Sequence, residues 1–387
     1  MKNKTPKTLK NKVAIYLPSM GGGGAERVTG TLANAMAARG VNVDLVLAQA
    51  TGPYLAQVNS AVNVVDLCAS RVLTSCPRLV NYLRQERPAA ILSVLNHANI
   101  IAIAARALSG VKSRLVVSEH NTLSSAVRGG LSLRGSLEVG AMKFSYPRAD
   151  AIVGVSNGVS DDLAKALGLP CGRVKTVYNP IDAVQIKKKS LEPVDHPWFA
   201  PGQPPVIIGI GRLTRQKNFG HLLNSFAFMR ASKGIEARLI ILGEGELRSD
   251  LEAQVKTLGL CACVALPGFV SNPYAYLRAA GLFVLSSSWE GLPTVLIEAM
   301  SCETKVVSTD CPSGPAEILE NGKWGRVVPM DDTEALSSAM ASALDDENPP
   351  NVYERASDFS VERSVDGYLQ LLQIPHSGQV AREMCGG

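Results

Sequence analysis

The sequence predicts an α/β protein with two doubly wound parallel sheets that face each other across a cleft. Three observations predict this fold. The chain has 387 residues, which is too long for one ordinary core and fits two domains. Hydrophobic residues make up 46% of it and charged residues only 19%, as is typical of a well-buried globular protein. Short apolar runs alternate with helical patterns along its length.

In the first half, continuous apolar runs rich in β-branched residues predict strands that are covered on both faces. The candidate strands are residues 12–18, 41–48, 89–95, 113–120 and 151–156. A helical pattern over residues 25–40 closes with Gly40, a common residue just beyond a helix C-terminus. Residues 1–185 are therefore predicted to form the N-terminal domain.

The second half repeats this organisation after a break in the pattern. Residues 183–205 are dense in Pro and Lys and lack periodicity, so residues 186–204 are predicted to be a linker and residues 205–359 a C-terminal domain. A helical pattern at about 360–374 is expected to pack back on the first domain. The candidate strands of the C-terminal domain are residues 205–213, 237–245, 263–269, 282–288 and 305–310.

Several classes of protein are disfavoured by composition. No run of about 18 apolar residues occurs, so no membrane-spanning helix is expected. The basic start leads into an apolar run that is shorter than the roughly 7–15 residues of a signal peptide, and we interpret it as a tail before the first strand. The eight cysteines are scattered without a Cys-x-x-Cys pair, and several lie in apolar runs, which favours reduced thiols in the cytoplasm.

Charge is distributed unevenly between the two halves. Residues 1–185 carry 21 Lys and Arg against 10 Asp and Glu, a net charge of +11, whereas the remainder carries 18 against 24, a net charge of −6. A basic half indicates an anionic ligand or surface as its partner. Nucleic acid is disfavoured, because aromatic residues total only 5% and are not interleaved with the basic ones.

Two loops that follow predicted strands could bind an anion. In "PSMGGGGAERVT", glycines that include Gly23 and Gly24 bring backbone N–H groups to the start of a helix. The spacing fits neither the dinucleotide nor the Walker pattern. In "GIGRLTRQKNF", Arg212 and Lys217 leave a strand end and could both reach a phosphate pair, although a flexible loop and ordinary surface charges are the plainer alternatives.

The stretch "SSSWEGLPTVLIEAM" combines a strand end, a loop and a helix start. Pro293 suits the first position of a helix, whose free N–H groups would stabilise an anion. Glu290 lies before this helix and Glu298 within it, so the two acids do not share one face. Carboxylates accept hydrogen bonds from paired hydroxyls, which suits a sugar, a diphosphate and a ribose in a row. Alone, this spacing would indicate two ordinary acids.

The full set of motifs strongly resembles the retaining glycosyltransferases of family 4, which have the GT-B fold of two Rossmann-like domains. The resemblance runs from about Lys12 to Gln373. Within the family, these motifs most resemble those of bacterial members that assemble lipid-linked oligosaccharides or surface polysaccharides. The motifs that carry it are the E-x7-E stretch above, "GRLTRQKNF", "ILGEGELRSDLE", "LPGFV", "CPSGPAEIL" and "GGGGAERV".

The resemblance implies roles for individual residues. Glu290 would contact the transferred sugar, Glu298 the ribose, and His120, in "SEHNT", would lie near the sugar on the acceptor side, although a lone histidine after a strand is more often structural. The implied catalytic residues are Glu290, His120, Arg212 and Lys217. The implied donor-binding residues are Gly23, Gly24, Arg212, Lys217, Val270, Glu290, Gly291, Leu292, Thr294 and Glu298.

The implied reaction is transfer of a hexose or N-acetylhexosamine from a UDP-sugar to a glycan acceptor carried on a lipid, with retention. The N-terminal domain would take the acceptor and the C-terminal domain the donor. No Asp-x-Asp pair is present to hold a divalent ion on the diphosphate, so neither a metal nor a cofactor is expected. Cations and a helix end could stabilise the leaving UDP instead. No carboxylate nucleophile is evident, and the family's usual proposal is front-face attack.

Three alternatives remain open. A nucleotide-sugar isomerase or epimerase of the same fold would bind similar ligands and transfer nothing. A catalytically silent nucleotide-sugar-binding protein would keep the scaffold. A dinucleotide dehydrogenase could use "GIGRL", but the third glycine is missing.

A cationic, partly apolar segment predicts peripheral binding to the inner face of the cell membrane. Residues 123–148 combine basic and apolar side chains, which can lie in the membrane interface. The alternative is that the apolar residues pack on the first sheet. The N-terminal "KNKTPKTLKNK" would add positive charge. The residues in question are Arg128, Arg134, Lys143 and Arg148, with Leu131, Leu133, Leu137, Met142 and Phe144, against Glu138 and the helix-breaking Gly129 and Gly130.

Overall fold

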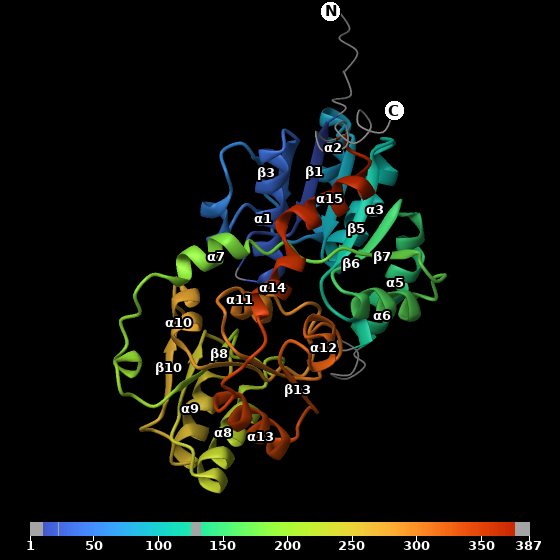
Figure 1. Ribbon diagram of the computed structural model, residues 1–387. Helices are drawn as coiled ribbons and strands as arrows, with labels where there is room; N and C mark the ends of the chain where they lie inside the picture. Colours follow the sequence, from blue (N-terminus) through green and yellow to red (C-terminus); the bar gives the residue numbers. More distant parts are fainter. Residues whose placement is uncertain (1–10, 22, 125–132, 376–387) are drawn as a thin grey trace, which may run out of the picture. The chain divides into compact units, whose positions relative to one another are not determined.

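The computed structural model describes residues 11–21, 23–124 and 133–375. The chain divides into two compact units, one of residues 1–180 and 361–387 and the other of residues 181–360. Each unit contains one parallel sheet (Figure 1). Among the described residues, no helix is both long and apolar enough to cross a membrane.

The sheet of the first unit has seven strands in the order β3-β2-β1-β4-β5-β6-β7, all parallel. The strand order reverses between β1 and β4, as in doubly wound folds. Its strands are β1 (Lys12–Leu17), β2 (Asn42–Leu47), β3 (Asn63–Asp66), β4 (Ala90–Val94), β5 (Arg114–Glu119), β6 (Ala151–Gly154) and β7 (Val174–Thr176).

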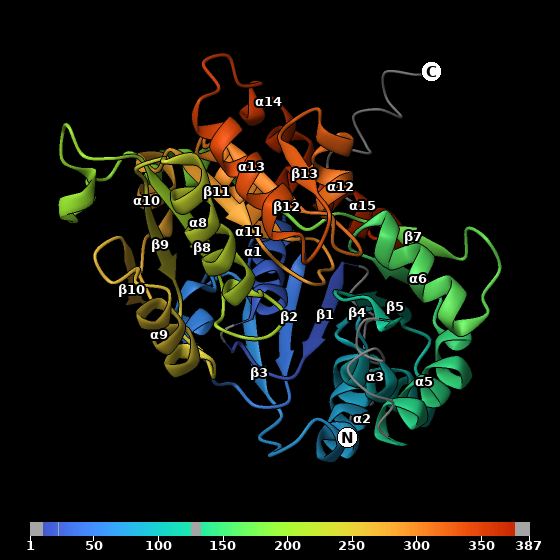
Figure 2. The same cartoon turned by 90° about the horizontal axis from the view of Figure 1, so that it is seen from below.

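Helices cover both faces of this sheet, which is why its central strands are apolar throughout. On one face, α2, α3 and α5 lie together (Figure 2). On the other, α1 packs beside α15, although more than three hundred residues separate them in the sequence. The helices are α1 (Gly24–Ala38), α2 (Cys76–Glu86), α3 (Asn96–Ser109), α5 (Leu133–Ser145), α6 (Asn157–Leu167) and α15 (Val361–Leu372).

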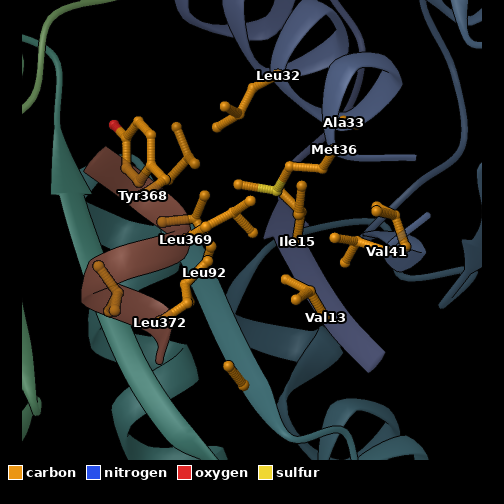
Figure 3. Packing of buried hydrophobic residues seen from close by; sticks show 14 of the residues in the cluster. Val13, Ile15, Leu32, Ala33, Met36, Val41, Leu92, Tyr368, Leu369 and Leu372 are labelled. Atoms are coloured by element: carbon orange, nitrogen blue, oxygen red, sulfur yellow. The ribbon is translucent and has the colours of Figure 1, made fainter. Parts of the chain in front are cut away.

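The C-terminal helix α15 completes the core of the first unit. Leu369 and Leu372 point into a buried cluster with Met36 of α1 and Ile15 of β1 (Figure 3). Arg114 Nε donates a hydrogen bond to the carbonyl oxygen of Leu371, which ties the helix to β5. Without α15, one face of the sheet would expose this apolar cluster to water.

The second unit has six parallel strands in the order β10-β9-β8-β11-β12-β13. Its strands are β8 (Val206–Ile210), β9 (Arg238–Leu242), β10 (Val264–Gly268), β11 (Leu282–Leu285), β12 (Val306–Thr309) and β13 (Arg326–Val328). Its helices are α7 (Ala183–Ser190), α8 (Phe219–Lys233), α9 (Arg248–Thr257), α10 (Pro273–Ala279), α11 (Thr294–Ser301), α12 (Pro315–Ile318), α13 (Thr333–Leu344) and α14 (Val352–Ala356).

The structure adds elements that the sequence patterns do not indicate. The edge strands β3, β7 and β13 contain only three or four residues, too few for a periodic signal. Helix α7 lies within the stretch that we interpreted as linker, where the Asp182 side chain accepts a hydrogen bond from Gln185 N–H at 2.8 Å and begins the helix.

Truncation of Leu369 should show that α15 stabilises the first unit. Leu369→Ala removes a fully buried side chain and is expected to cost about 2–5 kcal/mol. Hydrogen exchange followed by mass spectrometry should then show faster exchange in β1 and β4 and unchanged exchange in β8 and β11. The exposed neighbour provides the control, since Gln370→Ala should change neither. Unaltered protection of β1 in Leu369→Ala would contradict this role for the helix.

Candidate functional site

The central site of the second unit is built from two loops that follow neighbouring strands. β8 and β11 are hydrogen-bonded partners, and the strand order reverses between them. Ligands of doubly wound sheets bind beyond the carboxyl ends of the strands at such a reversal. Lys217 lies in the loop after β8 and Glu290 in the loop after β11. The predicted residues therefore lie where the topology provides a ligand site.

Lys217 and Glu290 form an ion pair that is largely shielded from water. The distance from Lys217 Nζ to Glu290 Oε1 is 2.6 Å, and the two side chains are 17% and 8% exposed. Ser287 Oγ donates a second hydrogen bond to the same carboxylate oxygen at 2.7 Å. A buried ion pair is tolerated when its remaining polar atoms are also satisfied. The carboxylate is thus held in one orientation by partners from both loops.

The serines after β11 hold the two loops against each other. Ser286 Oγ donates to the carbonyl oxygen of Lys217 at 2.8 Å, and Ser288 N–H donates to the carbonyl oxygen of Gln216 at 2.8 Å. Gln216 Nε2 in turn donates to the carbonyl oxygen of Trp289 at 3.0 Å. Sequence reasoning missed these roles. The run of three serines at a strand end was the available signal.

The second acid of the E-x7-E stretch is buried in α11. Glu298 lies in the second turn of this helix and is only 4% exposed. We had predicted Pro293 as the first residue of this helix. The helix instead begins at Thr294, and Pro293 precedes it as the N-cap. Gly291 and Leu292 form the entry to the helix.

The "CPSGPAEIL" motif packs directly on this entry. Gly314 has φ of 100°, and a Cβ atom there would lie 2.4 Å from Cδ of Pro293. Only glycine avoids both the strained backbone and the clash. The two motifs are therefore parts of one structure.

Two further predicted residues lie at the same edge of the sheet. Arg212 is exposed in the loop after β8, and Val270 is half-buried just beyond β10. Backbone hydrogen bonds link the ends of the neighbouring strands β8, β9 and β10. Gly211 N–H donates to the carbonyl oxygen of Leu242, and Gly243 N–H donates to the carbonyl oxygen of Gly268. Within the described ranges, no hydrogen bond or ion pair joins Arg212 or Val270 to the Lys217–Glu290 pair.

In the first unit, the glycine-rich loop follows β1 and leads into α1. Gly23 is the N-cap of α1 and Gly24 its first residue. A Cβ atom at Gly23 would lie 2.2 Å from Oε2 of Glu26, whose carboxylate folds back over the helix start. This is the position where the helix dipole stabilises negative charge. The Glu26 carboxylate therefore lies at the positive end of the α1 dipole.

His120 follows β5 and lies on the face of the sheet that carries α15. Its Nε2 lies 3.3 Å from Ser118 Oγ, which in turn lies 3.0 Å from the hydroxyl oxygen of Tyr368. Burial lowers the pKa of His120 to about 4. The imidazole is therefore neutral at physiological pH and can donate or accept a hydrogen bond without carrying charge.

A buried carboxyl group lies on the opposite face of the same strand end. Glu119 Oε1 accepts hydrogen bonds from the Tyr146 hydroxyl and from Asn99 Nδ2, the latter at 2.9 Å. Burial raises the pKa of Glu119 to about 7, although both hydrogen bonds act in the other direction. Because side chains alternate along a strand, Glu119 and His120 belong to separate polar clusters. We did not predict this cluster from the sequence.

Helix α5 exposes an apolar face beside basic side chains. Leu137 and Phe144 are 71% and 72% exposed, and they lie two turns apart on one face of the helix. Arg148 stacks on Phe144 with 4.0 Å between its guanidinium carbon and the ring centroid. Met142, which we had grouped with the lipid-facing residues, is fully buried in the core.

The predicted membrane segment is described only in part. Arg128, Gly129, Gly130 and Leu131 lie outside the described residues, as do residues 1–10 of the N-terminal basic segment. Lys12, which we had counted in that segment, is instead buried in β1, where its ammonium group pairs with Asp44 and Glu86. Lys143 is exposed, and the half-buried Glu138 accepts a hydrogen bond from Asn96 at 2.6 Å. In the described part of the chain, no group of three or more His, Cys, Asp or Glu side chains could hold a metal ion.

Two family models match the chain and together cover most of it. Residues 22–185 match the model described as Glycosyltransferase Family 4. Residues 194–359 match the model described as Glycosyl transferases group 1.

Similar proteins act in bacterial glycan assembly. N-Acetylgalactosamine-N,N'-diacetylbacillosaminyl-diphospho-undecaprenol 4-alpha-N-acetylgalactosaminyltransferase of Campylobacter jejuni is 29% identical over 361 residues, which cover 89% of this chain and 93% of its own. The amylovoran biosynthesis glycosyltransferase AmsD of Erwinia amylovora is 28% identical, over 82% of this chain and 85% of its own.

Solved structures share the fold. HepE of Anabaena, in complex with UDP, superposes with a TM-score of 0.77 at 20% identity, over 94% of this chain and 99% of its own. Sucrose-phosphate synthase of Thermosynechococcus elongatus gives a TM-score of 0.75 at 18% identity, over 94% and 98%. At these identities the likeness establishes the fold alone, which is the GT-B fold with two Rossmann-like domains.

The buried carboxyl group of Glu119 should give the first unit a measurable pH dependence. Between its ordinary pKa of 4.5 and its folded pKa of about 7, the folded state retains a proton that the unfolded state releases. Stability is therefore lost as pH rises through this window. Relative to wild type, Glu119→Gln should gain on the order of 3 kcal/mol between pH 4.5 and 7. Urea unfolding monitored by hydrogen exchange in β5 measures this difference.

The exposed acid Glu362 on α15 provides the control, and Glu362→Gln should show no such gain. A difference between Glu119→Gln and wild type that stays constant over the window would contradict the assignment.

Proposed function

Because the chain belongs to glycosyltransferase family 4, we propose that it moves a sugar with retention from a nucleotide-sugar donor to a lipid-linked glycan acceptor. The donor is a UDP-hexose or a UDP-N-acetylhexosamine. The product enters surface polysaccharide or lipid-linked oligosaccharide assembly. The relatives from Campylobacter jejuni and Erwinia amylovora, and the UDP complex of HepE, support this substrate class.

The observation that carries the proposal is the Lys217–Glu290 pair at the strand-order reversal of the second unit. An ammonium group has three donors, and Glu290 takes one of them. Two remain for the oxygens of a diphosphate, with Arg212 on the same loop as a second cation. Glu290 keeps its hydrogen bond from Ser287 and is oriented to accept from sugar hydroxyls.

In this proposal, other residues at the same edge of the sheet make further contacts with the donor. Glu298 binds the ribose, the backbone at Gly291, Leu292 and Thr294 contacts the sugar and phosphates, and the backbone of Val270 reads the base. Gly23 and Gly24 contribute the diphosphate contact of the first unit. In this proposal the second unit is the donor domain and the first unit takes the acceptor, beside His120.

Transfer proceeds on the front face of the donor sugar. The bond from the anomeric carbon to the phosphate oxygen breaks, and its electron pair stays with UDP. The acceptor hydroxyl oxygen bonds to the same face of that carbon, and its proton passes to the phosphate oxygen. Lys217, Arg212 and the start of α11 stabilise the charge that develops on UDP. Glu290 is fixed by Lys217 and Ser287, which suits a binding group better than a nucleophile.

The donor-site assignment predicts separable defects in two variants. Lys217→Ala should lower kcat about 10²–10³-fold, as does removal of one oxyanion donor. Glu298→Ala should weaken UDP binding, measured by calorimetry. The assay follows UDP released from UDP-GalNAc, UDP-GlcNAc, UDP-Glc or UDP-Gal with a polyprenyl-diphosphate-linked oligosaccharide. Lys256→Ala, an exposed lysine of α9, should behave as wild type.

Turnover and UDP affinity within twofold of wild type in both variants would exclude this site. Conversion of a UDP-sugar to its epimer without UDP release would favour the isomerase alternative. UDP-sugar binding with no reaction would favour a silent binding protein. Transfer should persist in EDTA. Activity that EDTA abolishes and magnesium restores would overturn metal independence.

We further propose that α5 places the enzyme on the inner face of the cytoplasmic membrane, close to its lipid-linked acceptor. Leu137, Gly140, Ala141 and Phe144 are all exposed and recur at helical spacing. The large apolar side chains of Leu137 and Phe144 therefore lie on either side of the small residues Gly140 and Ala141 on one exposed face of the helix. Arg148 and the exposed Lys143 lie beside this face, and cations are attracted to anionic headgroups by about 1 kcal/mol each.

Vesicle co-sedimentation tests this placement. Binding should require anionic phosphatidylglycerol and weaken with salt, because charges are screened within about 8–10 Å. Substitution of both Leu137 and Phe144 by Ser should release most of the protein. Val184→Ser removes an equally exposed apolar side chain from the second unit and should have no effect. Wild-type protein that stays in the supernatant at low salt would contradict membrane binding without affecting the donor-site assignment.

A further inference from the structure

Three buried polar groups form a line from the C-terminal helix to His120. The hydroxyl of Tyr368, on α15, lies 3.0 Å from Ser118 Oγ, and Ser118 Oγ lies 3.3 Å from His120 Nε2. Tyr368 and Ser118 are almost completely buried, and His120 is 9% exposed. The ring of Tyr368 packs beside Leu369 and Leu372, with its hydroxyl at the edge of that cluster (Figure 3).

The line has no other hydrogen-bonding partners in the part of the chain that the structure describes. Tyr368 OH bonds there only to Ser118, and His120 Nδ1 has no partner. Ser118 Oγ is therefore the one link between the two rings. Its single proton can point toward either the histidine or the tyrosine.

Only one direction satisfies every buried hydroxyl. If Tyr368 donates to Ser118 and Ser118 donates to His120 Nε2, each O–H group has an acceptor. In the reverse direction His120 Nε2–H donates to Ser118, Ser118 donates to Tyr368, and the phenol proton is left buried without an acceptor. An unsatisfied buried polar group is strongly disfavoured. Tyr368 thus acts as the donor at the start of the line.

We propose that Tyr368 is a positioning residue that, through Ser118, fixes His120 as the Nδ1–H tautomer. The tautomer of an imidazole is set by the hydrogen bond that its other nitrogen makes. Nε2 is used as an acceptor inside the fold, so Nδ1–H is presented as a neutral donor. The opposite tautomer would present a lone pair and accept from a hydroxyl instead.

The consequence for substrate binding rests on the proposed function. A neutral Nδ1–H donor suits an oxygen of the transferred sugar or of the acceptor. The protonation state of His120 would not change across physiological pH, since burial keeps the imidazole uncharged. Tyr368 on α15 would then control the chemistry of a residue that lies 248 positions before it in the sequence.

Nitrogen NMR of the imidazole tests the tautomer directly. Protein labelled with ¹⁵N-histidine should show His120, assigned by its loss in His120→Asn, as a single Nδ1–H tautomer. Tyr368→Phe removes one oxygen atom and keeps the packing, and Ser118→Ala breaks the link. Both should give a mixture of tautomers or the Nε2–H form. Tyr16→Phe removes a different buried Tyr–Ser hydrogen bond from the same unit and should leave His120 unchanged.

Kinetics then shows whether the tautomer matters for transfer. With UDP-sugar and a polyprenyl-diphosphate glycan, Tyr368→Phe should lower kcat/KM about three- to tenfold, the loss expected for one neutral hydrogen bond, and His120→Asn should lower it at least as far. The double variant should be no worse than His120→Asn alone.

An Nε2–H tautomer in wild type, or an unchanged tautomer in either Tyr368→Phe or Ser118→Ala, would overturn the inference. Additive losses in the double variant would also overturn it, because Tyr368 would then act independently of His120. If wild type transfers no sugar, the proposed function fails while the NMR spectrum still decides the tautomer.

Discussion

The pairing of β8 with β11 is the constraint on which the candidate donor site depends. More than seventy residues separate these strands in the sequence, yet their parallel hydrogen bonding brings the two following loops together. Lys217 and Glu290 can then form an ion pair at 2.6 Å, and the serine run can hydrogen-bond across the gap. A purely local interaction could not fix two opposite charges at this spacing. The sheet provides the rigidity and the loops provide the chemistry.

The first unit uses the alternation of a single strand to separate two polar clusters. At the end of β5, Ser118 and His120 point to one face and Glu119 points to the other. Tyr368 and Tyr146 contribute the hydroxyl groups, one from each layer of helices. Each cluster is buried, so its hydrogen bonds carry more free energy than they would in water. Packing and polar chemistry are therefore linked at the point where the proposed acceptor domain meets its ligand.

Much of this fold could be predicted from the sequence, because apolar runs and glycines report directly on buried strands and on turns after them. The same runs located the loops that carry Arg212, Lys217 and Glu290. Patterns of this kind cannot report contacts between distant segments. Such contacts depend on which strands and helices become neighbours. They include the hydrogen bond between Tyr368 and Ser118, the burial of Glu119, and the hydrogen bonds from Ser286 and Ser288 to the loop after β8. Met142 was misassigned for a related reason: a hydrophobic residue on an amphipathic helix can face the core or the surface.

The first unit consists of two separate segments of the chain, and this affects how it folds during synthesis. A ribosome makes its residues 1–180 first, yet the helix that closes the core appears only with residues 361–372, after the whole of the second unit. The second unit is contiguous and can fold while the first is still incomplete. During that interval the apolar stripe around Ile15 and Met36 is uncovered and exposed to chaperones. Interruption of translation before α15 would yield a chain whose second unit is folded and whose first unit is prone to aggregation and proteolysis.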